Sequence, residues 1–312
     1  MPPVFFFREE FSVFSLKPKI LKFLPAGIVC LLIVCILFGF RIFKWEPESI
    51  EVNRHEVFLK NWHGEHNGLR FVIVSDIHQL DPPEDIARLK RVVRLVNDEK
   101  PDVILLLGDF IGERFNWKRK NASPEAIAAI LKELKSARGV FAVLGNHDWW
   151  HGGDAVRKAL EDVGIKVLEN ESAELLIDGK VLNLIGLPDR ITRNHVLNTG
   201  LLPDAAVPAI VLSHNPDYFE ELKLPYEFML AGHTHGGQVQ LPWIGALIVP
   251  SKYGAKYASG FFEDGGRKLF VTRGTGTSII KARFLCPPEI AVITIRKEAA
   301  EDNPSPAAST AL

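Results

Sequence analysis

The stretch LRFVIVSDIH at residues 69–78 places a run of β-branched and aromatic residues directly before an aspartate and a histidine. Such a run is typical of a buried strand. Two later runs follow the same plan, because VILLL at 103–107 precedes Gly108-Asp109 and VFAVL at 140–144 precedes Gly145-Asn146-His147. These runs predict strands that end in chemically active side chains.

Amphipathic segments separate these strands. Apolar residues recur at helical spacing within 83–96, and further helices are expected at about 124–137, where Ser123 is a candidate N-cap, and at about 154–163. The alternation predicts an α/β layered domain. Asp178-Gly179 indicates a hairpin turn. The other expected strands are 50–62, 173–177, 181–187, 209–212, 228–231, 269–272 and 290–295.

Residues 23–40, FLPAGIVCLLIVCILFGF, carry no charge. Eighteen helical residues span roughly 27 Å, enough to cross the hydrocarbon core of a membrane. A cleaved signal peptide is the alternative, but no A-x-A-like cleavage site follows. We therefore expect a cytoplasmic segment at 1–22, a transmembrane helix at 23–43, one large folded domain at 44–296 and a disordered tail at 297–312. Basic residues flank the span about equally, and an extracytoplasmic domain is the favoured orientation.

The overall charge is balanced, with 37 Lys and Arg residues against 38 Asp and Glu residues in a chain of 312. This balance argues against a non-specific polyanion binder, so no nucleic acid partner is inferred. Three cysteines, two of them inside the apolar segment, cannot form a disulfide scaffold.

Acidic and imidazole side chains follow five of the expected strands, and we expect these strand ends to converge on one edge of a sheet. Each motif alone has a structural explanation as a turn or helix cap. The pair in Gly232-His233-Thr234-His235 is more specific, because residues two apart on an extended segment point the same way. The full set is Asp76, His78, Asp109, Asn146, His147, Asp148, His214, His233 and His235.

Carboxylate, carboxamide and imidazole ligands without cysteine suit Mn, Fe, Ni or Zn. Seven such side chains beside His147 are too many for one tetrahedral ion, and they suit two. Two ions about 3.5–4 Å apart can stabilise an in-line phosphoryl displacement.

These motifs, D-x-H, G-D, G-N-H-D, H and G-H-x-H in this order, resemble the calcineurin-like metallophosphoesterases over roughly residues 50–296. The strings LSHNPD, AGHTHGGQV and RGTGTS, with the apolar N-terminus, look most like a membrane-associated bacterial branch of that family. The resemblance implies a layered β-sandwich flanked by helices. It also implies one metal on Asp76, His78 and His235, a second on Asn146, His214 and His233, and Asp109 as the bridge.

The resemblance further implies that His147 contacts the phosphate and protonates the leaving oxygen, while Asp148 orients a histidine. The implied activity is hydrolysis of phosphodiester or related phosphoester bonds by metal-activated hydroxide, with manganese favoured and the substrate possibly lipid-linked. One alternative is a pyrophosphatase acting on a nucleotide-linked lipid such as UDP-2,3-diacylglucosamine, in lipid A synthesis. An alternative of another class is an inactive metal-binding scaffold.

Two further features have two interpretations each. Arg273, Lys281 and Arg283 flank the RGTGTS loop and could neutralise a phosphate or form a solvated basic face. The apolar stretch LPWIGALIVP at 241–250 is by default core packing. The functional interpretation is a wall for a lipid-like substrate or a contact with the membrane surface.

Overall fold

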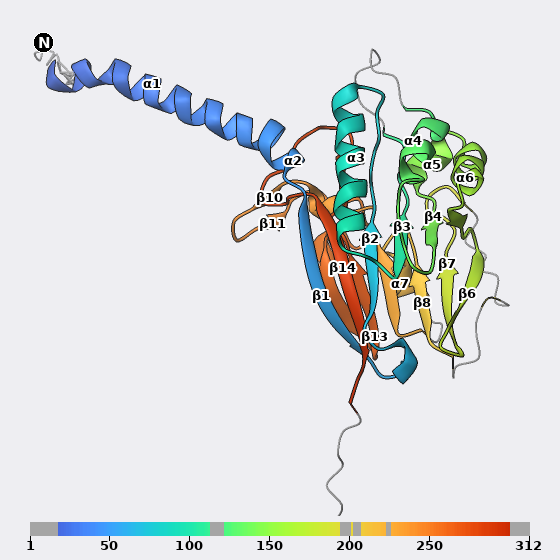
Figure 1. Ribbon diagram of the computed structural model, residues 1–312. Helices are drawn as coiled ribbons and strands as arrows, with labels where there is room; N and C mark the ends of the chain where they lie inside the picture. The colour runs from blue at the N-terminus through green and yellow to red at the C-terminus, as the bar shows by residue number, and fades with distance from the viewer. Residues whose placement is uncertain (1–17, 113–121, 194–200, 202–206, 223–225, 300–312) are drawn as a thin grey trace, which may run out of the picture. The chain divides into compact units, whose positions relative to one another are not determined.

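The computed structural model describes residues 18–112, 122–193, 201, 207–222 and 226–299 (Figure 1). Residues 1–17 of the expected cytoplasmic segment and 300–312 of the expected tail lie outside the described residues. The chain divides into two compact units, residues 1–41 and residues 42–312.

The first unit contains helix α1, Pro18–Phe40. A π-helical turn, Arg41–Trp45, follows across the division between the units, and the short α2, Glu46–Glu48, lies in the second unit. The helical stretch Gly27–Glu48 is long and apolar enough to cross a membrane by its length and composition. Side chains of its apolar segment, such as Leu31 and Ile36, are exposed.

The second unit is built on two six-stranded sheets (Figure 1). The first sheet has the order β1-β14-β2-β3-β4-β5, and β14 pairs parallel with β1 but antiparallel with β2. The strands from β2 to β5 are parallel. Their bounds are β1 Glu51–Leu59, β2 Leu69–Val74, β3 Val103–Leu107, β4 Val140–Val143, β5 Lys166–Val167 and β14 Glu289–Lys297.

The second sheet has the order β12-β13-β9-β8-β7-β6. Strands β13, β9, β8 and β7 are parallel to one another, while β12 and β6 pair antiparallel at the two edges. The bounds are β6 Glu171–Ile177, β7 Lys180–Gly186, β8 Ala209–Leu212, β9 Phe228–Ala231, β12 Gly260–Asp264 and β13 Arg267–Val271.

Alternate side chains of each central strand enter different layers of the core. Phe71 and Ile73 of β2 pack between the two sheets, whereas Val72 and Val74 pack beneath the helices on the outer face of the first sheet. Because both faces are covered, these strands are apolar at nearly every position. The covering helices are α3 Pro83–Asp98, α4 Pro124–Leu131 and α6 Gly153–Asp162, with α7 Tyr218–Glu221 on the outer face of the second sheet.

The layered sandwich implied by the family resemblance is therefore confirmed. The expected single sheet edge is wrong, however. β2, β3 and β4 lie in the first sheet, and β8 and β9 lie in the second. The polar residues thus follow strand ends of two facing sheets, and the site forms where these ends meet.

Several local predictions are confirmed. Asp178 and Gly179 both have positive φ, 47° and 81°, as the turn of the β6–β7 hairpin requires. Ser123 caps α4, because its Oγ accepts the Ala126 N–H at 3.2 Å.

The tail was expected to begin at Lys297, but that residue still belongs to β14.

Helix α4 ends at Leu131, six residues before the expected end at Ala137. Asn97 of α3 provides the physical reason. Its Oδ1 accepts the Lys135 N–H at 2.8 Å and its Nδ2 donates to the Glu133 carbonyl at 2.9 Å. These bonds hold the chain in a turn that a continued helix could not form.

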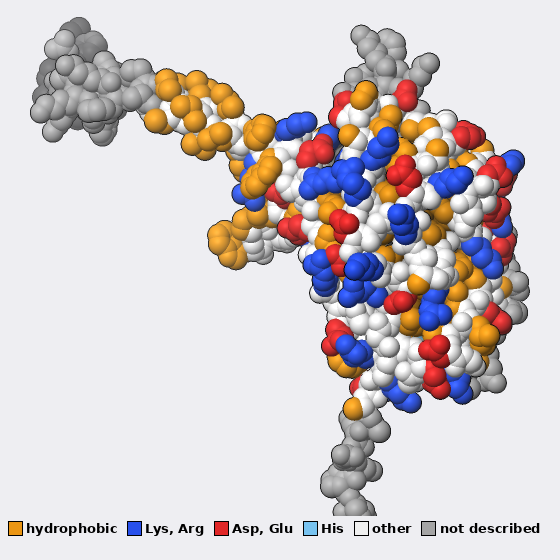
Figure 2. Space-filling model, viewed as in Figure 1, with side chains coloured by type: hydrophobic (Ala, Val, Ile, Leu, Met, Phe, Trp, Pro, Cys, Tyr) orange, Lys and Arg blue, Asp and Glu red, His pale blue; other side chains and the backbone are white. Residues whose placement is uncertain are grey.

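The default expectation that residues 241–250 pack in the core is wrong. The short strands β10, Gln240–Leu241, and β11, Gly245–Ala246, form a hairpin with an exposed tip. Trp243 is fully exposed, and the exposed fractions of Ile244 and Ile248 are 69% and 81%. The hairpin projects from the second unit with hydrophobic side chains at its end (Figures 1 and 2).

Candidate metal centre

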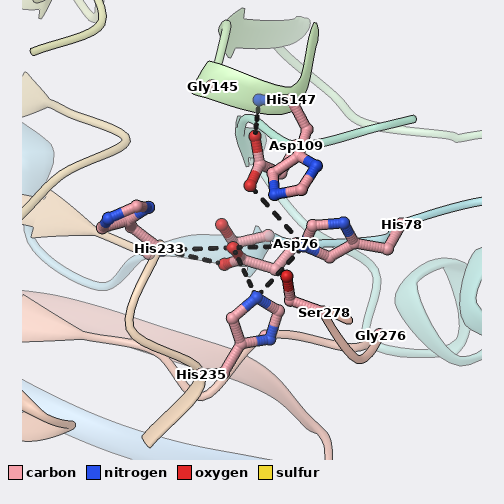
Figure 3. Close-up of polar contacts among 12 residues, drawn as sticks. Asp76, His78, Asp109, Gly145, His147, His233, His235, Gly276 and Ser278 are labelled. Carbon is pink, nitrogen blue, oxygen red and sulfur yellow. Dashed lines mark hydrogen bonds and ion pairs between the residues drawn. The ribbon is translucent and has the colours of Figure 1, made fainter. Parts of the chain in front are cut away.

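The structure gathers the side chains of the five motifs at the carboxyl ends of β2, β3, β4, β8 and β9 (Figure 3). Three overlapping groups have ligand atoms within 4.8 Å of one another: Asp76, His78 and His235; His78, Asp109 and His147; and Asp109, His214 and His233. All seven of these side chains are at least nine-tenths buried.

The first group is compact. His78 Nε2 lies 3.1 Å from His235 Nε2, and His235 Nε2 lies 3.3 Å from Asp76 Oδ1. Asp76 also accepts the backbone N–H of His233, at 3.0 Å to Oδ2, and so its orientation is fixed by the motif that supplies His235.

Asp109 lies between His78 of the first group and His214 of the third group. Its Oδ2 is 3.5 Å from His78 Nε2 and 3.2 Å from His214 Nε2, and its Oδ1 accepts the His147 N–H at 2.9 Å. His214 Nε2 in turn lies 3.1 Å from His233 Nδ1. One carboxylate thus faces ligand atoms of both groups.

These residues fit metal ions. Two ligand atoms each about 2.1 Å from one ion lie roughly 3 to 3.5 Å apart, which matches the spacing of the imidazole nitrogens. Asn146 follows Gly145 at the start of α5, Asn146–Trp150, and its buried Oδ1 has no hydrogen-bond partner among the described residues. A buried oxygen without a partner is costly, and a cation would satisfy it.

The backbone at the site is strained. Five residues of the site have φ between 46° and 71°, the left-handed region that residues other than glycine rarely adopt. They are Asp76, His78, Asp109, His233 and His235. Such strain clusters at functional sites, where the surrounding structure must enforce it. At each of these residues the backbone turns sharply after a strand, so that the acidic and imidazole side chains point toward one another.

Glycines allow the close contacts that this strain requires. A Cβ added to Gly145 would lie 2.2 Å from Asp109 Oδ1, and one added to Gly232 would lie 2.0 Å from Ser75 Oγ. The glycines of G-N-H-D and G-H-x-H therefore serve packing against the aspartate loops.

Asp148 does not orient a histidine, and this expectation is wrong. Its two oxygens accept four backbone N–H groups, from Asp109 at 2.9 Å, Phe110 at 2.8 Å, Ile111 at 3.2 Å and Gly145 at 3.0 Å. The carboxylate of α5 therefore holds the loop that carries Asp109.

The basic residues near RGTGTS form hydrogen bonds and ion pairs within the protein. Arg283 is fully buried and donates to the carbonyls of Gly276 at 2.6 Å, Arg273 at 2.8 Å and Cys286 at 2.9 Å. Arg273 pairs with Glu51 and Glu289, and Lys281 pairs with Glu48. Neither phosphate neutralisation nor a solvated face describes this cluster.

The RGTGTS loop instead supports the first motif. Thr275 N–H donates to the Ser75 carbonyl at 2.9 Å and Gly276 N–H to the Asp76 carbonyl at 2.7 Å. Arg88 of α3, which the sequence analysis missed, donates to the carbonyls of Thr275 and Ile77 at 2.8 and 2.6 Å. Its helical position gave no signal, because a charged residue in an amphipathic helix usually faces solvent.

His147 is a member of the second group, with His78 and Asp109. Its ring packs edge-on against His78, with centroids 4.7 Å apart, and against the half-exposed Trp150 at 4.8 Å. The His147 side chain thus lies between the buried groups and an exposed aromatic residue of the same helix.

In the metal-free site, the buried histidines differ in their protonation. Burial lowers the pKa of His78 and His235 well below the ordinary value, and lowers the pKa of His233 to about 4. Burial would also lower the pKa of His214, but the charge of Asp109 and their hydrogen bond raise it to about 10. Burial alone would raise the pKa of Asp109, yet His214 and His78 hold it well below its usual range. Three histidines are therefore neutral, as ligands must be.

Comparisons with known proteins agree with this geometry. The family model described as calcineurin-like phosphoesterase matches residues 69–237. The chain is 33% identical over 256 residues to a protein named "Uncharacterized metallophosphoesterase YkuE" from Bacillus subtilis, which covers 80% of this chain and 87% of the relative.

Two other relatives carry more specific names. "Phosphodiesterase YaeI" of Escherichia coli is 30% identical over 259 residues, covering 80% of this chain and 90% of the relative. "UDP-2,3-diacylglucosamine pyrophosphatase LpxG" of Chlamydia trachomatis is 28% identical over 305 residues, with the same two coverages.

Metal binding should release a proton from His214. In the metal-free protein its Nδ1 faces the Leu107 carbonyl at 2.8 Å and its Nε2 faces Asp109, so both nitrogens carry hydrogen. Because the pKa of His214 lies near 10, affinity for Mn²⁺ should rise up to about tenfold per pH unit between about pH 6 and 8. Calorimetry in buffers of different ionisation enthalpy would count the protons released, and a pH-independent affinity would contradict this prediction.

Asp148→Asn should destabilise the fold, because an amide offers one oxygen to four N–H donors and turns its own NH₂ toward them. We expect the free energy of unfolding of the metal-free chain in detergent to fall by about 2–4 kcal/mol. Thermal unfolding with chelator present would measure this. Asp154→Asn, at an exposed position in the first turn of α6, is the matched control. Equal losses in the two variants would refute the role given to Asp148.

Proposed function

Because the chain belongs to the calcineurin-like phosphoesterase family, we propose that it is a membrane-anchored phosphoesterase with two metal ions, acting on phosphodiester or related bonds. One observation carries this proposal. Five strand ends of two sheets bring carboxylate and imidazole side chains into three overlapping buried groups, linked to one another through His78 and Asp109.

We assign the residues that would hold the ions to two sets, adding Asn146 to these groups for its buried Oδ1 and reserving His147 as the proton donor. Asp76, His78 and His235 form one set, Asn146, His214 and His233 form the other, and Asp109 faces both. Manganese is favoured, with iron, nickel or zinc as the alternatives. When bound, divalent ions at such sites lower the pKa of water and neutralise charge on a phosphate.

The protein itself contributes orientation and a proton. The Asp148 carboxylate accepts the Asp109 N–H, and the His147 N–H donates to Asp109 Oδ1, so the shared carboxylate does not need to reorganise during the reaction. We assign His147 the role of proton donor to the leaving oxygen, because imidazole is a common general acid. Its ring borders both the ligand group and the exposed Trp150.

A phosphodiester is the favoured substrate, and the name of the YaeI relative, a phosphodiesterase, supports it. The second candidate is the pyrophosphate bond of a nucleotide-linked lipid, supported by the name of the LpxG relative and by the exposed apolar hairpin. An inactive metal-binding scaffold is disfavoured, since every ligand position and His147 are intact.

The N-terminal helix supports a single-pass location in the cell membrane. We propose that residues 1–22 lie in the cytoplasm and that the metal-binding domain, 44–296, lies outside it. The tail from 297 is proposed to be disordered beyond the end of β14.

Hydrolysis of bis-p-nitrophenyl phosphate by the full chain in detergent with Mn²⁺ tests the function. His147→Ala should retain two metals and lose about 10²–10⁴-fold in kcat, because only proton donation is removed. Asp109→Ala should lose a metal as well as turnover, since it removes the shared ligand. Metal content by mass spectrometry accompanies each rate.

Loss of a metal in His147→Ala would show that its assigned role is wrong. Failure of the wild-type chain, loaded with two metals, to hydrolyse either the diester or p-nitrophenyl phosphate would favour the scaffold. A much higher kcat/KM for UDP-2,3-diacylglucosamine than for the diester would favour the second candidate.

The orientation has its own test. Alkaline phosphatase fused after Leu312 should be active in cells, because this reporter folds only outside the cytoplasm, whereas a green fluorescent protein fused there through the general secretion route should be dark. The opposite pattern would place the domain in the cytoplasm.

A further inference from the structure

An exposed apolar surface follows the G-H-x-H motif in the chain, and none of its residues has been given a catalytic or metal-holding role. It combines the tip of the β10–β11 hairpin with the neighbouring loop of residues 278–286, and we call it the apolar rim. Its members are Trp243, Ile244, Leu247, Ile248, Ile279 and Ile280, each at least 57% exposed. No charged residue occurs between Leu241 and Pro250.

The two parts of the rim form one structural element. Gln238 binds the loop through its side chain, since its Oε1 accepts the Ser278 N–H at 2.7 Å and its Nε2 donates to the Ser278 carbonyl at 3.2 Å. The backbones pair as well, because Gln240 N–H donates to the Phe284 carbonyl at 2.8 Å and Phe284 N–H to the Gln238 carbonyl at 2.9 Å. The exposed residues are therefore held on an ordered support.

The rim adjoins the point at which the second unit begins. Arg283 N–H donates to the Ile42 carbonyl at 3.0 Å, and Cys286 N–H donates to Glu46 Oε1 at 2.7 Å. Lys281 pairs with Glu48. Phe43 and Trp45, at this same starting segment, are 57% and 60% exposed. Residues 42–48 belong to the second unit and also to the stretch Gly27–Glu48 that could cross a membrane, so a membrane holding this stretch would meet the second unit beside the rim.

We propose that the apolar rim inserts into the lipid bilayer as a second membrane contact, with Trp243 at the lipid–water boundary. Continuity with the anchor favours a bilayer over a protein partner as the occupant. A fully exposed tryptophan between aliphatic side chains is also the composition of an interfacial contact. This inference rests on the membrane anchor of the proposed function.

The rim is tied rigidly to the metal ligands. The hairpin begins directly after His235-Gly236-Gly237, and a Cβ added to Gly237 would lie 2.6 Å from Ala246 Cβ. Gln240 Nε2 donates to the Gly236 carbonyl at 3.1 Å. An inserted rim therefore fixes the metal centre near the membrane surface, where phosphoesters of amphiphilic molecules present their phosphates.

Depth-dependent fluorescence quenching of the full chain tests the insertion. Single-cysteine variants are labelled with an environment-sensitive nitrobenzoxadiazole and reconstituted into vesicles of phosphatidylcholine and phosphatidylglycerol. Cys30 and Cys35 are replaced by serine, while the buried Cys286 is kept. The rim probe is Ile248→Cys, with Trp243→Cys as a second position. The control is Leu176→Cys, a 69% exposed leucine on the edge strand β6.

We expect nitroxide-labelled acyl chains to quench both rim probes about threefold or more above the Leu176 control, with a blue-shifted emission. Equal quenching at rim and control would overturn the inference. A blue shift without acyl-chain quenching would also overturn it, because protein rather than lipid would then cover the rim. Retained Mn²⁺ binding verifies the fold of each variant.

A probe on the native Cys35 separates the two proposals. Quenching at Cys35 without quenching at Ile248 or Trp243 would leave the anchor intact and refute insertion of the rim. A probe at Cys35 that stays accessible to aqueous iodide would refute both the anchor and the insertion.

Discussion

The rest of the site depends on the position of the Asp109 carboxylate, which faces histidines from both sheets. A single buried carboxylate faces His78 from one sheet and His214 from the other, at 3.5 and 3.2 Å. Such a charge is stable only when it is paired and hydrogen-bonded. The left-handed loop, the glycine of G-N-H-D and the four N–H bonds to Asp148 all keep this carboxylate in place. Much of the local structure is thus explained by one buried negative charge.

The sequence predicted the elements that have a strong periodic signal. β-branched runs predicted the positions of β2, β3, β8 and β9, and the motifs named the acidic and imidazole side chains that the structure brings together. It could not assign the strands to two sheets, because a residue's own neighbours do not encode which sheet a strand joins. The early end of α4 was missed for a similar reason, since it depends on Asn97 of another helix.

Supporting residues were harder to predict than ligands. Arg88 and Arg283 hold backbone carbonyls of the Asp76 and RGTGTS loops, and neither belongs to a motif with its own spacing. Their role follows only from burial and from contacts between distant segments. The same holds for the apolar hairpin, because residues 241–250 have a composition equally suited to a core strand. Only the fold shows that this apolar stretch is exposed.

The place of β14 has a consequence for biosynthesis. This last strand lies between β1 and β2, and Glu51 at the start of β1 pairs with Glu289. The first strand to leave the ribosome therefore has no partner in the sheet until the C-terminal strand has been made. The apolar helix α1 precedes β1, so in the proposed membrane-anchored chain the nascent domain would be tethered before it can close. A long interval with an open sheet edge favours assistance by a chaperone, and any truncation before residue 297 would remove the strand that joins β1 to the rest of the sheet.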